Sequence, residues 1–341
     1  MKEINNIILE MIKDNKSVNE IVKRTGISHK RLFYRLSLLK LKGFNFNTKY
    51  YYNGDIVYNM KNNLEIEKTE GTSIITSKDD NEFKAMIISD LHLGSFEDRL
   101  DLLNNIYEYC SKKGINIILN IGDLIEGPYG IYKKRIDSCE EQIEYTIKNY
   151  PFDKNILNFI CLGNHDYNAI KASGQDLALA LQSRRHDLIP IGYGTGILNI
   201  KNDQIILRHP ETISTNATFN NKIIFFGHSH KAKVIHSLTN ISIYTPSLSN
   251  QNFTSNEILP GALEINLKFT NGYYTTATIS HLLLTKNNIF KINEMQFNTS
   301  SGKNFSTKVI HNEENKNKVL TLEKHNTKLS QIDKFNKRYN R

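Results

Sequence analysis

The fold is decided by residues 85–92, which read AMIISDLH, an apolar run that ends in polar residues. Four consecutive apolar residues are typical of a strand that is buried on both faces. The pattern recurs at residues 116–123, which read NIILNIGD, and at residues 157–166, which read LNFICLGNHD. Helical patterns separate these runs, so the segment predicts an α/β fold with an at least partly parallel sheet. Three strands would therefore deliver Asp, His and Asn side chains to one edge of that sheet.

Two later segments repeat this arrangement. Residues 204–209 read QIILRH, and residues 222–230 read KIIFFGHSH, where Gly227 allows the backbone to turn before the two histidines. Carboxylate, imidazole and amide donors without a thiolate suit Mn, Fe or Zn. Seven such ligands exceed one tetrahedral zinc site and fit two ions about 3.5–4 Å apart that share a carboxylate. The candidate metal ligands are Asp90, His92, Asp123, Asn164, His209, His228 and His230.

The ordered series Asp-x-His, Gly-Asp, Gly-Asn-His-Asp, His and Gly-His-x-His resembles the calcineurin-like metallophosphoesterase family over roughly residues 84–295. The resemblance implies a four-layer α/β/β/α sandwich with two divalent metal ions at the strand ends. Mn²⁺ is the first expectation, and Fe and Zn are the alternatives. The first ion would be held by Asp90, His92 and His230, the second by Asn164, His209 and His228, and both by Asp123.

The resemblance also implies roles for two further residues. His165 would stand near the leaving group as the general acid, and Glu126 would orient that histidine. The protein-phosphatase branch is not favoured, because it is typified by Gly-Asp-x-x-Asp-Arg-Gly and Gly-Asn-His-Glu. Here residues 122–127 read GDLIEG and residues 163–166 read GNHD. The chain is therefore expected to be a hydrolase acting on phosphoester bonds.

The N-terminal segment has a different pattern. Apolar residues recur with helical spacing over residues 4–12, Ser17 and Glu20 form a capping box, and Ser28 can cap a third helix that ends at Gly43. Asn53-Gly54 between two aromatic and β-branched runs predicts a hairpin. This layout resembles a winged helix-turn-helix domain, which implies DNA contact by basic residues of the third helix. These are Lys30, Arg31, Arg35, Lys40 and Lys42.

Charge is distributed unevenly along the chain. Residues 1–62 carry 12 Lys and Arg against 5 Asp and Glu, and residues 300–341 carry 10 against 4. The formal net charge is +9, so residues 63–299 sum to −4. Basic ends indicate an anionic partner, and DNA held by the N-terminal segment is the leading interpretation. A helical module that docks a protein partner, and simple solubilisation by the C-terminal residues, are the alternatives.

The chain is expected to be cytoplasmic. No apolar run approaches the roughly 18 residues that a membrane span requires, and the first residues lack a signal-peptide layout. Cys110, Cys139 and Cys161 form no CxxC pair and are expected to be reduced thiols.

Four regions are expected: residues 1–62 as a winged helix-turn-helix-like domain, 63–83 as a linker or edge element, 84–299 as the metallophosphoesterase domain, and 300–341 as a basic, flexible tail. The leading function is a DNA-associated phosphodiesterase or nuclease. One alternative is a phosphomonoesterase that acts on a small molecule or nucleotide. The other is a DNA-binding regulator whose metal domain is not catalytic.

Overall fold

The computed structural model describes residues 2–60, 71–77, 80–129, 133–210, 222–236, 240–249, 259–300 and 304–311. Seven helices lie in these ranges: α1 Lys2–Lys13, α2 Val18–Thr25, α3 His29–Leu41, α4 Leu100–Lys113, α5 Cys139–Asn149, α6 Asn164–Ser173 and α7 Leu177–Arg184. None of them is long and apolar enough to cross a membrane.

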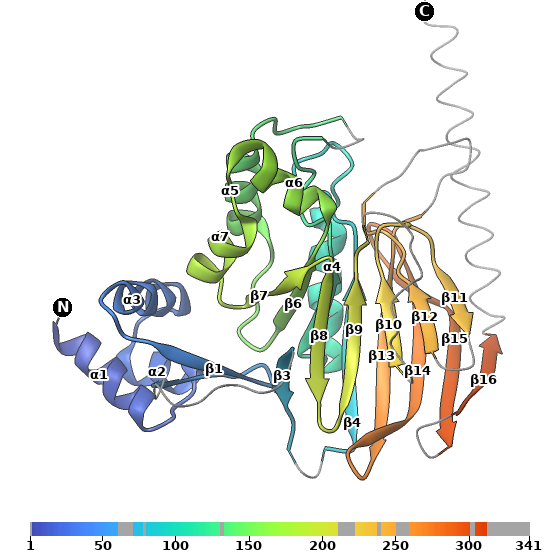
Figure 1. Cartoon of the computed structure of the whole chain (residues 1–341), viewed down its shortest axis with the longest axis horizontal. Helices are drawn as coiled ribbons and strands as arrows, with labels where there is room; N and C mark the ends of the chain where they lie inside the picture. The colour runs from blue at the N-terminus through green and yellow to red at the C-terminus, as the bar shows by residue number, and fades with distance from the viewer. Residues whose placement is uncertain are drawn as a thin grey trace, which may run out of the picture.

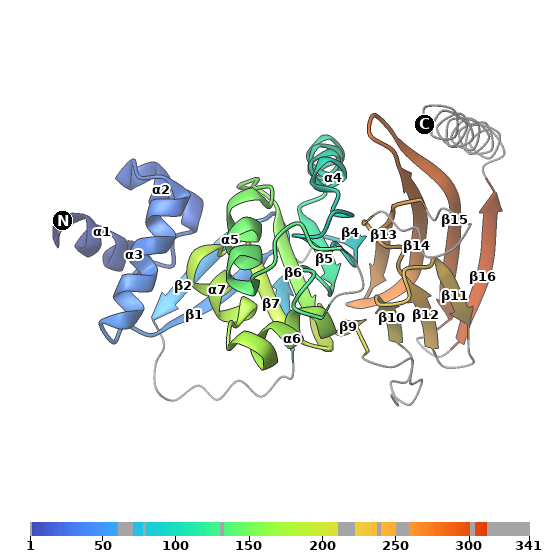
Figure 2. The same cartoon turned by 90° about the horizontal axis from the view of Figure 1, so that it is seen from above.

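Sixteen strands form two eight-stranded sheets within the described residues (Figures 1 and 2). The first sheet has the order β16-β15-β14-β13-β4-β5-β6-β7, and the second has the order β11-β12-β10-β9-β8-β3-β1-β2. The strands are β1 Phe46–Tyr51, β2 Ile56–Met60, β3 Thr72–Ile75, β4 Glu82–Ile88, β5 Ile117–Ile121, β6 Leu157–Leu162, β7 Leu188–Tyr193, β8 Thr195–Ile200, β9 Asp203–Arg208, β10 Lys222–Phe226, β11 Lys233–His236, β12 Asn240–Tyr244, β13 Gly261–Thr270, β14 Tyr273–Leu284, β15 Ile289–Ser300 and β16 Asn304–His311.

Side chains on alternate faces of the strands belong to two different hydrophobic cores. On β4, Ile87 belongs to the core between the two sheets, whereas Met86 and Ile88 belong to the core beneath the helices. Successive side chains of a strand point to opposite faces, so a continuous apolar run serves two cores at once. Strands β4 to β7 are parallel, as expected, and the remaining half of this sheet is antiparallel. The α/β fold class is thereby confirmed.

The outer face of the second sheet is also apolar. Ile206, Ile224, Phe226 and Tyr244 form a separate buried cluster there. They alternate with Leu207, Phe225 and Ile243, which face the first sheet. The second sheet therefore has an apolar outer face as well as an apolar inner face, as expected for a sheet inside a layered sandwich.

The three expected N-terminal helices and the hairpin are present. Ser17 and Glu20 form the predicted capping box at the start of α2, with hydrogen bonds of 3.3 and 2.8 Å. The turn at Asn53-Gly54 needs glycine, because a Cβ at Gly54 would lie 2.0 Å from the carbonyl oxygen of Asn155. The elements thus follow local capping and turn chemistry, while the winged helix-turn-helix interpretation stays a prediction.

The N-terminal hairpin is part of the second sheet. Strand β1 pairs with β2 and also with β3. Strand β3 in turn pairs with β8, which belongs to the part of the chain after residue 83. Helix α3 lies against α7, where Ser37 donates a 2.9 Å hydrogen bond to the carbonyl of Ser183. The ring of Phe33 stacks on His186 at 4.4 Å, and Tyr58 hydrogen-bonds to the same histidine. The segments before and after residue 62 therefore share one sheet and one core.

Residues 304–311, which the sequence assigns to a flexible tail, form the edge strand β16 instead. They pair with β15 over eight residues from Asn304 to His311. An edge strand is held largely by backbone hydrogen bonds, so sparse apolar residues do not rule it out. Residues 312–341 of the expected tail lie outside the described residues.

Candidate metal centre

The seven predicted metal ligands meet at one edge of the two sheets. Asp90 and His92 follow β4, Asp123 follows β5, and Asn164 begins α6 directly after β6. The second sheet contributes the other three from the ends of two neighbouring strands: His209 after β9, and His228 and His230 after β10. Each ligand thus stands where a buried strand gives way to a turn, which is where parallel strands of an α/β sheet assemble a site.

Five of these residues have a left-handed backbone. The φ angles are 55° at Asp90, 48° at His92, 50° at Asp123, 68° at His228 and 59° at His230. Only eight described residues other than glycine have positive φ, so this conformation is concentrated at the site. Each such residue costs on the order of 1–3 kcal/mol, and such cost accumulates where function requires a particular geometry.

Glycines allow the ligand-bearing turns to approach one another. A Cβ at Gly163 would lie 2.3 Å from Asp123 Oδ1, and a Cβ at Gly122 would lie 2.3 Å from His209 Nδ1. A Cβ at Gly227 would lie 2.2 Å from the carbonyl oxygen of Ile121. These glycines therefore leave room for the ligand side chains.

The side chains form two groups of donors. Ligand atoms of Asp90, His92 and His230 lie within 4.8 Å of one another, and so do those of Asp123, His209 and His228. The contacts within and between the groups are His230 Nε2 to Asp90 Oδ1 at 3.1 Å, His209 Nε2 to Asp123 Oδ2 at 2.9 Å, His209 Nε2 to Asn164 Oδ1 at 3.2 Å, His228 Nδ1 to Asn164 Oδ1 at 3.1 Å and His209 Nε2 to Asp90 Oδ1 at 4.0 Å.

The hydrogen bonds behind the ligands fit a metal centre. His209 Nδ1 donates to the carbonyl of Ile121 at 2.6 Å, which leaves the lone pair on Nε2, the atom that faces Asp123. Ser89 donates to Asp90 Oδ2 at 2.5 Å, and Ser247 donates to the backbone carbonyl of Asp90 at 2.9 Å. Such outer contacts fix the tautomer and orientation of metal ligands.

The electrostatics of the centre favour a cation. Burial alone would lower the pKa of His209, but the carboxylates of Asp123 and Asp90 raise it to about 10. Burial alone would raise the pKa of Asp123, but His209, then His165 and His92, lower it. A buried pair of carboxylates thus holds positive charge beside it, and the oxygen and nitrogen donors suit divalent ions such as Mn, Fe or Zn.

Glu126 is placed differently from the expectation. Its carboxylate Oε2 lies 2.9 Å from His92 Nδ1, so the side chain orients His92. The residue that it was expected to orient, His165, instead donates from Nδ1 to the backbone carbonyl of Glu126 at 2.7 Å. His165 Nε2 lies 3.9 Å from Asp123 Oδ2. Sequence spacing places Glu126 near both His92 and His165. It does not tell which imidazole contacts the carboxylate of Glu126 and which contacts its backbone carbonyl.

Asp166 has a positioning role that the sequence left open. Its buried carboxylate accepts hydrogen bonds from the backbone N–H groups of Gly163 at 2.8 Å, Ile125 at 3.0 Å and Leu124 at 3.2 Å. It therefore caps α6 and joins the start of that helix to the turn after Asp123. Its position three residues after Gly163 is the signal that a capping rule can detect.

The expected DNA-contacting residues do not share one environment. Arg35 is buried and donates a 2.6 Å hydrogen bond to Asn5 Oδ1 within the helical segment, so the prediction that it contacts DNA is wrong. It lies on the inner face of α3, beside Leu36 and Leu39. The other four are exposed: Lys30, Arg31, Lys40 and Lys42.

The chain is similar to one known family and to several solved structures. The calcineurin-like phosphoesterase family model matches residues 83–232. A phosphoesterase from E. coli, Yfce, is 16% identical, with a TM-score of 0.39 over 61% of this chain and 97% of that one. Vacuolar Protein Sorting 29 from Cryptosporidium parvum is 13% identical, with a TM-score of 0.38 over 68% and 100% of the respective chains.

A conserved uncharacterised protein from Streptococcus pneumoniae, described as a predicted phosphoesterase, is 12% identical, with a TM-score of 0.34 over 67% of this chain and 98% of that one. No curated protein matches the chain. All seven candidate ligands lie within the residues that the family model matches. Residues 83–232 of this chain therefore match the calcineurin-like phosphoesterase family, and the match supports a hydrolase acting on phosphoester bonds.

Proposed function

We propose that this chain is a DNA-associated phosphodiesterase, or nuclease, with a centre of two divalent ions, of which Mn²⁺ is the first candidate. The observation that carries the proposal is the convergence of two donor groups on a shared edge. Asp90, His92 and His230 would hold one ion, and Asn164, His209 and His228 the other. Asp123 would bridge them, because its carboxylate is in contact with His209 and lies toward His165.

The ions, when bound, would lower the pKa of a shared water to about 7 and neutralise charge on the phosphate. The protein supplies orientation and a proton. Because His165 Nδ1–H is held by the carbonyl of Glu126, its Nε2 is the atom directed toward the centre. In the imidazolium form this nitrogen donates a proton to the departing oxygen, which then leaves as an alcohol.

Association with DNA is supported by charge. Residues 1–62 have a net charge of +7, and the exposed cations of α3 and its C-cap are Lys30, Arg31, Lys40 and Lys42. Phosphate contacts by such side chains hold a protein on DNA without reading its sequence. Phe33 and Ser37 of α3 contact the rest of the chain, so they do not contribute to this charged surface.

The direct test is to incubate the purified full chain and Mn²⁺ with labelled single- and double-stranded DNA, a small phosphodiester and a small phosphomonoester. We expect cleavage of DNA and of the diester, which a chelator abolishes. Asp123→Asn should lose at least a hundredfold in turnover, whereas Asp14→Asn, an exposed control on the N-terminal helices, should not. Hydrolysis of the monoester alone would reject the nuclease and support the phosphomonoesterase.

A further inference from the structure

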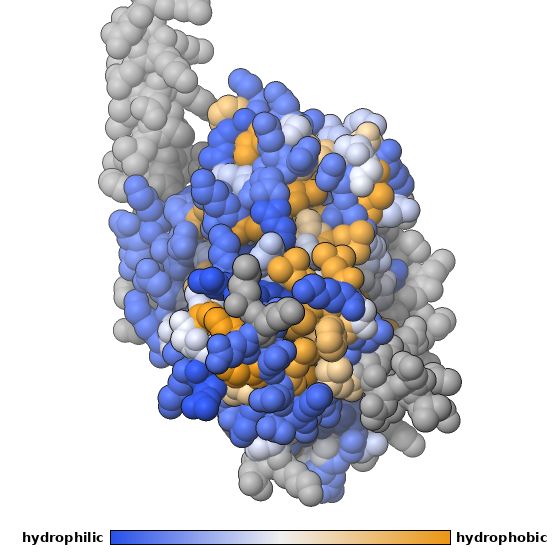
Figure 3. Space-filling view, turned by 90° about the vertical axis from the view of Figure 1, so that its left-hand side faces the viewer, coloured by the Kyte–Doolittle hydropathy of each residue, from blue (hydrophilic) through white to orange (hydrophobic). Residues whose placement is uncertain are grey.

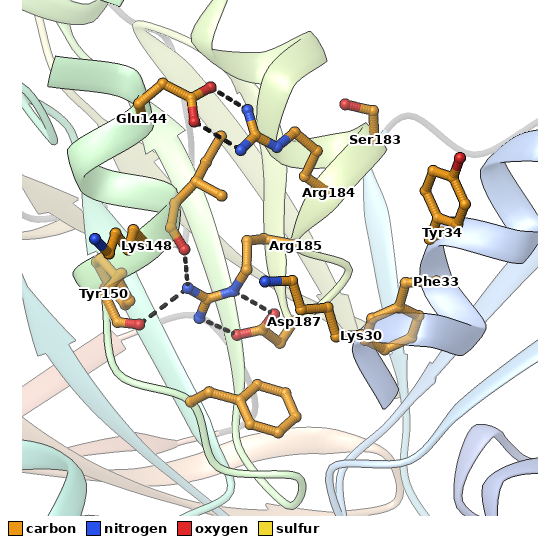
Figure 4. Close-up of a pocket in the computed structure, with 12 residues that line it drawn as sticks. Lys30, Phe33, Tyr34, Glu144, Lys148, Tyr150, Ser183, Arg184, Arg185 and Asp187 are labelled. Atoms are coloured by element: carbon orange, nitrogen blue, oxygen red, sulfur yellow. Dashed lines mark hydrogen bonds and ion pairs between the residues drawn. The ribbon is translucent and has the colours of Figure 1, made fainter. Parts of the chain in front are cut away.

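A groove lies between the N-terminal helices and the phosphoesterase region (Figure 4). It has a volume of about 600 Å³, within the roughly 300–1,000 Å³ typical of ligand sites. One wall is α3, which contributes Lys30, Phe33 and Tyr34. The other wall is formed by the end of α5 with the segment after it, and by the end of α7. The groove shares no residue with the candidate metal centre.

The arginines of the groove are already engaged. Arg184 forms a bidentate ion pair with Glu144. Arg185 forms a bidentate ion pair with Asp187, with distances of 2.7 and 2.9 Å. Arg185 also donates to three backbone carbonyls, at Ile147, Tyr150 and Pro151. These two arginines therefore fix the wall of the groove, and their charges are balanced by the neighbouring carboxylates.

Two lysines carry the remaining charge. Lys30 stands on the wall made by α3, and Lys148 stands on the wall made by α5. Both are exposed, and neither forms an ion pair with another described residue. A groove with one such cation on each wall favours an anion that reaches both of them.

Aromatic rings are exposed in the same groove. The side chain of Tyr34 is 63% exposed and that of Phe152 is 49% exposed, although both are large and apolar in part. Figure 3 shows apolar side chains among hydrophilic ones on the face that carries the N-terminal helices. Exposed rings beside lysines form the combination on which unstacked bases and their phosphates bind.

We propose that this groove binds a single strand of nucleic acid, with bases against Tyr34 and Phe152 and phosphates at Lys30 and Lys148. The inference rests on the proposed function. The groove would hold one part of the substrate strand, while the metal centre would cut a phosphodiester bond in another part. A duplex fits the groove less well, since its bases are stacked on one another and cannot reach the two rings.

Binding is to be measured with the full chain in a chelator, so that no cleavage occurs, by fluorescence anisotropy of labelled 12-mers of dT and rU and of a 12-base-pair duplex. We expect Tyr34→Ala with Phe152→Ala, and Lys30→Gln with Lys148→Gln, each to weaken single-strand binding at least tenfold. The lysine pair should also reduce the salt slope of log Kd by about 1.4, which loss of structure would not do. Tyr34→Phe alone, which keeps the ring, should bind like the wild-type protein.

Matched controls lie outside the groove. Tyr273→Ala removes an exposed ring on β14, and Lys13→Gln removes an exposed cation on α1. Both should leave single-strand binding unchanged. Unchanged binding in the groove variants, or equal affinity for a mononucleotide and a 12-mer, would overturn the proposal.

The experiments distinguish failure of the groove proposal from failure of the proposed nuclease function. If the groove variants bind strands normally while Mn²⁺-dependent diester hydrolysis persists, only the groove proposal falls. If strands bind through the groove while no phosphodiester is hydrolysed, the groove proposal stands and the nuclease does not.

Discussion

The carboxylate of Glu126 lies 2.9 Å from Nδ1 of His92, with both side chains fully buried. This contact places Glu126 behind a proposed metal ligand. His165 donates a hydrogen bond to the backbone carbonyl of the same residue. A carboxylate in this position fixes the ring of the ligand and increases its basicity, and loss of such a contact typically costs 10–100-fold in metal affinity or activity.

Glu126→Gln should therefore raise the Mn²⁺ concentration needed for half-maximal hydrolysis by 10–100-fold, because a neutral amide supports His92 less strongly. Turnover at saturating Mn²⁺ should change much less. Metal titration of the initial rate checks this. Glu10→Gln, at an exposed position on α1, is the matched control. A large loss of turnover at saturating metal, with an unchanged activation constant, would show that Glu126 acts on His165 after all.

His165→Ala should lower turnover by about 10²–10⁴-fold, the usual contribution of a general acid. The loss should be large for an alkyl phosphodiester and small for a nitrophenyl diester, whose leaving group needs no proton. Rates for both substrates, measured on the wild-type protein and the variant, give this comparison, and single-strand binding should not change. His281→Asn, on β14, serves as the control. Equal losses on the two substrates would contradict proton donation by His165.

Gly163→Ala should abolish most activity and lower stability. The added Cβ would lie 2.3 Å from Asp123 Oδ1 and 2.6 Å from Asp123 N, so the proposed bridging residue must move. Gly174→Ala is the informative control. It has a positive φ of 70° but nothing within 4 Å of the added atom, so it should cost about 1 kcal/mol of stability and leave turnover intact. Thermal unfolding and the hydrolysis rate test both; normal turnover in Gly163→Ala would disprove the steric argument.

His186 should make stability depend on pH. Burial, and then the charge of Lys40, lower its pKa to about 3, so it stays neutral in the folded protein while the unfolded chain is protonated below about 6.5. Stability is therefore lost as pH falls from about 6.5 towards 3. Between pH 6 and 4 this loss is about 2 kcal/mol. Denaturant unfolding of the wild-type protein and His186→Gln should show a shallower dependence in the variant.

Tyr58→Phe separates the charge effect from the contact. It removes the hydrogen bond to His186 but leaves the histidine buried, so it should lower stability by a similar amount at each pH. The pH slope should then stay that of the wild-type protein. If His186→Gln keeps the full slope, the titration belongs to another group.

The sequence predicts that the candidate ligands converge, because the strand ends and the side chains that follow them are read from the same residues. Asp90, Asp123 and Asn164 each follow an apolar run, and parallel strands bring such positions together. His209 has no motif of its own, but its place after β9, parallel to β10, sets it beside His228.

Other features depend on contacts that no local pattern contains. The burial of Arg35 requires Asn5, which is thirty residues away. The pairing of β3 with β8 joins residues more than a hundred positions apart, and it makes the N-terminal hairpin part of the second sheet. Strand β16 needs the exposed edge of β15, which only the assembled sheet provides.

The continuity of the second sheet from the β1–β2 hairpin to β10 has a consequence for rearranging this protein. The residues before position 62 complete the same sheet as the rest of the chain and are not packed as an independent unit. Cutting the chain there would strip β3 of its neighbour and leave an open hydrogen-bonding edge prone to self-association. Exchanging this segment for an unrelated binding domain would therefore require a new pairing partner for β3.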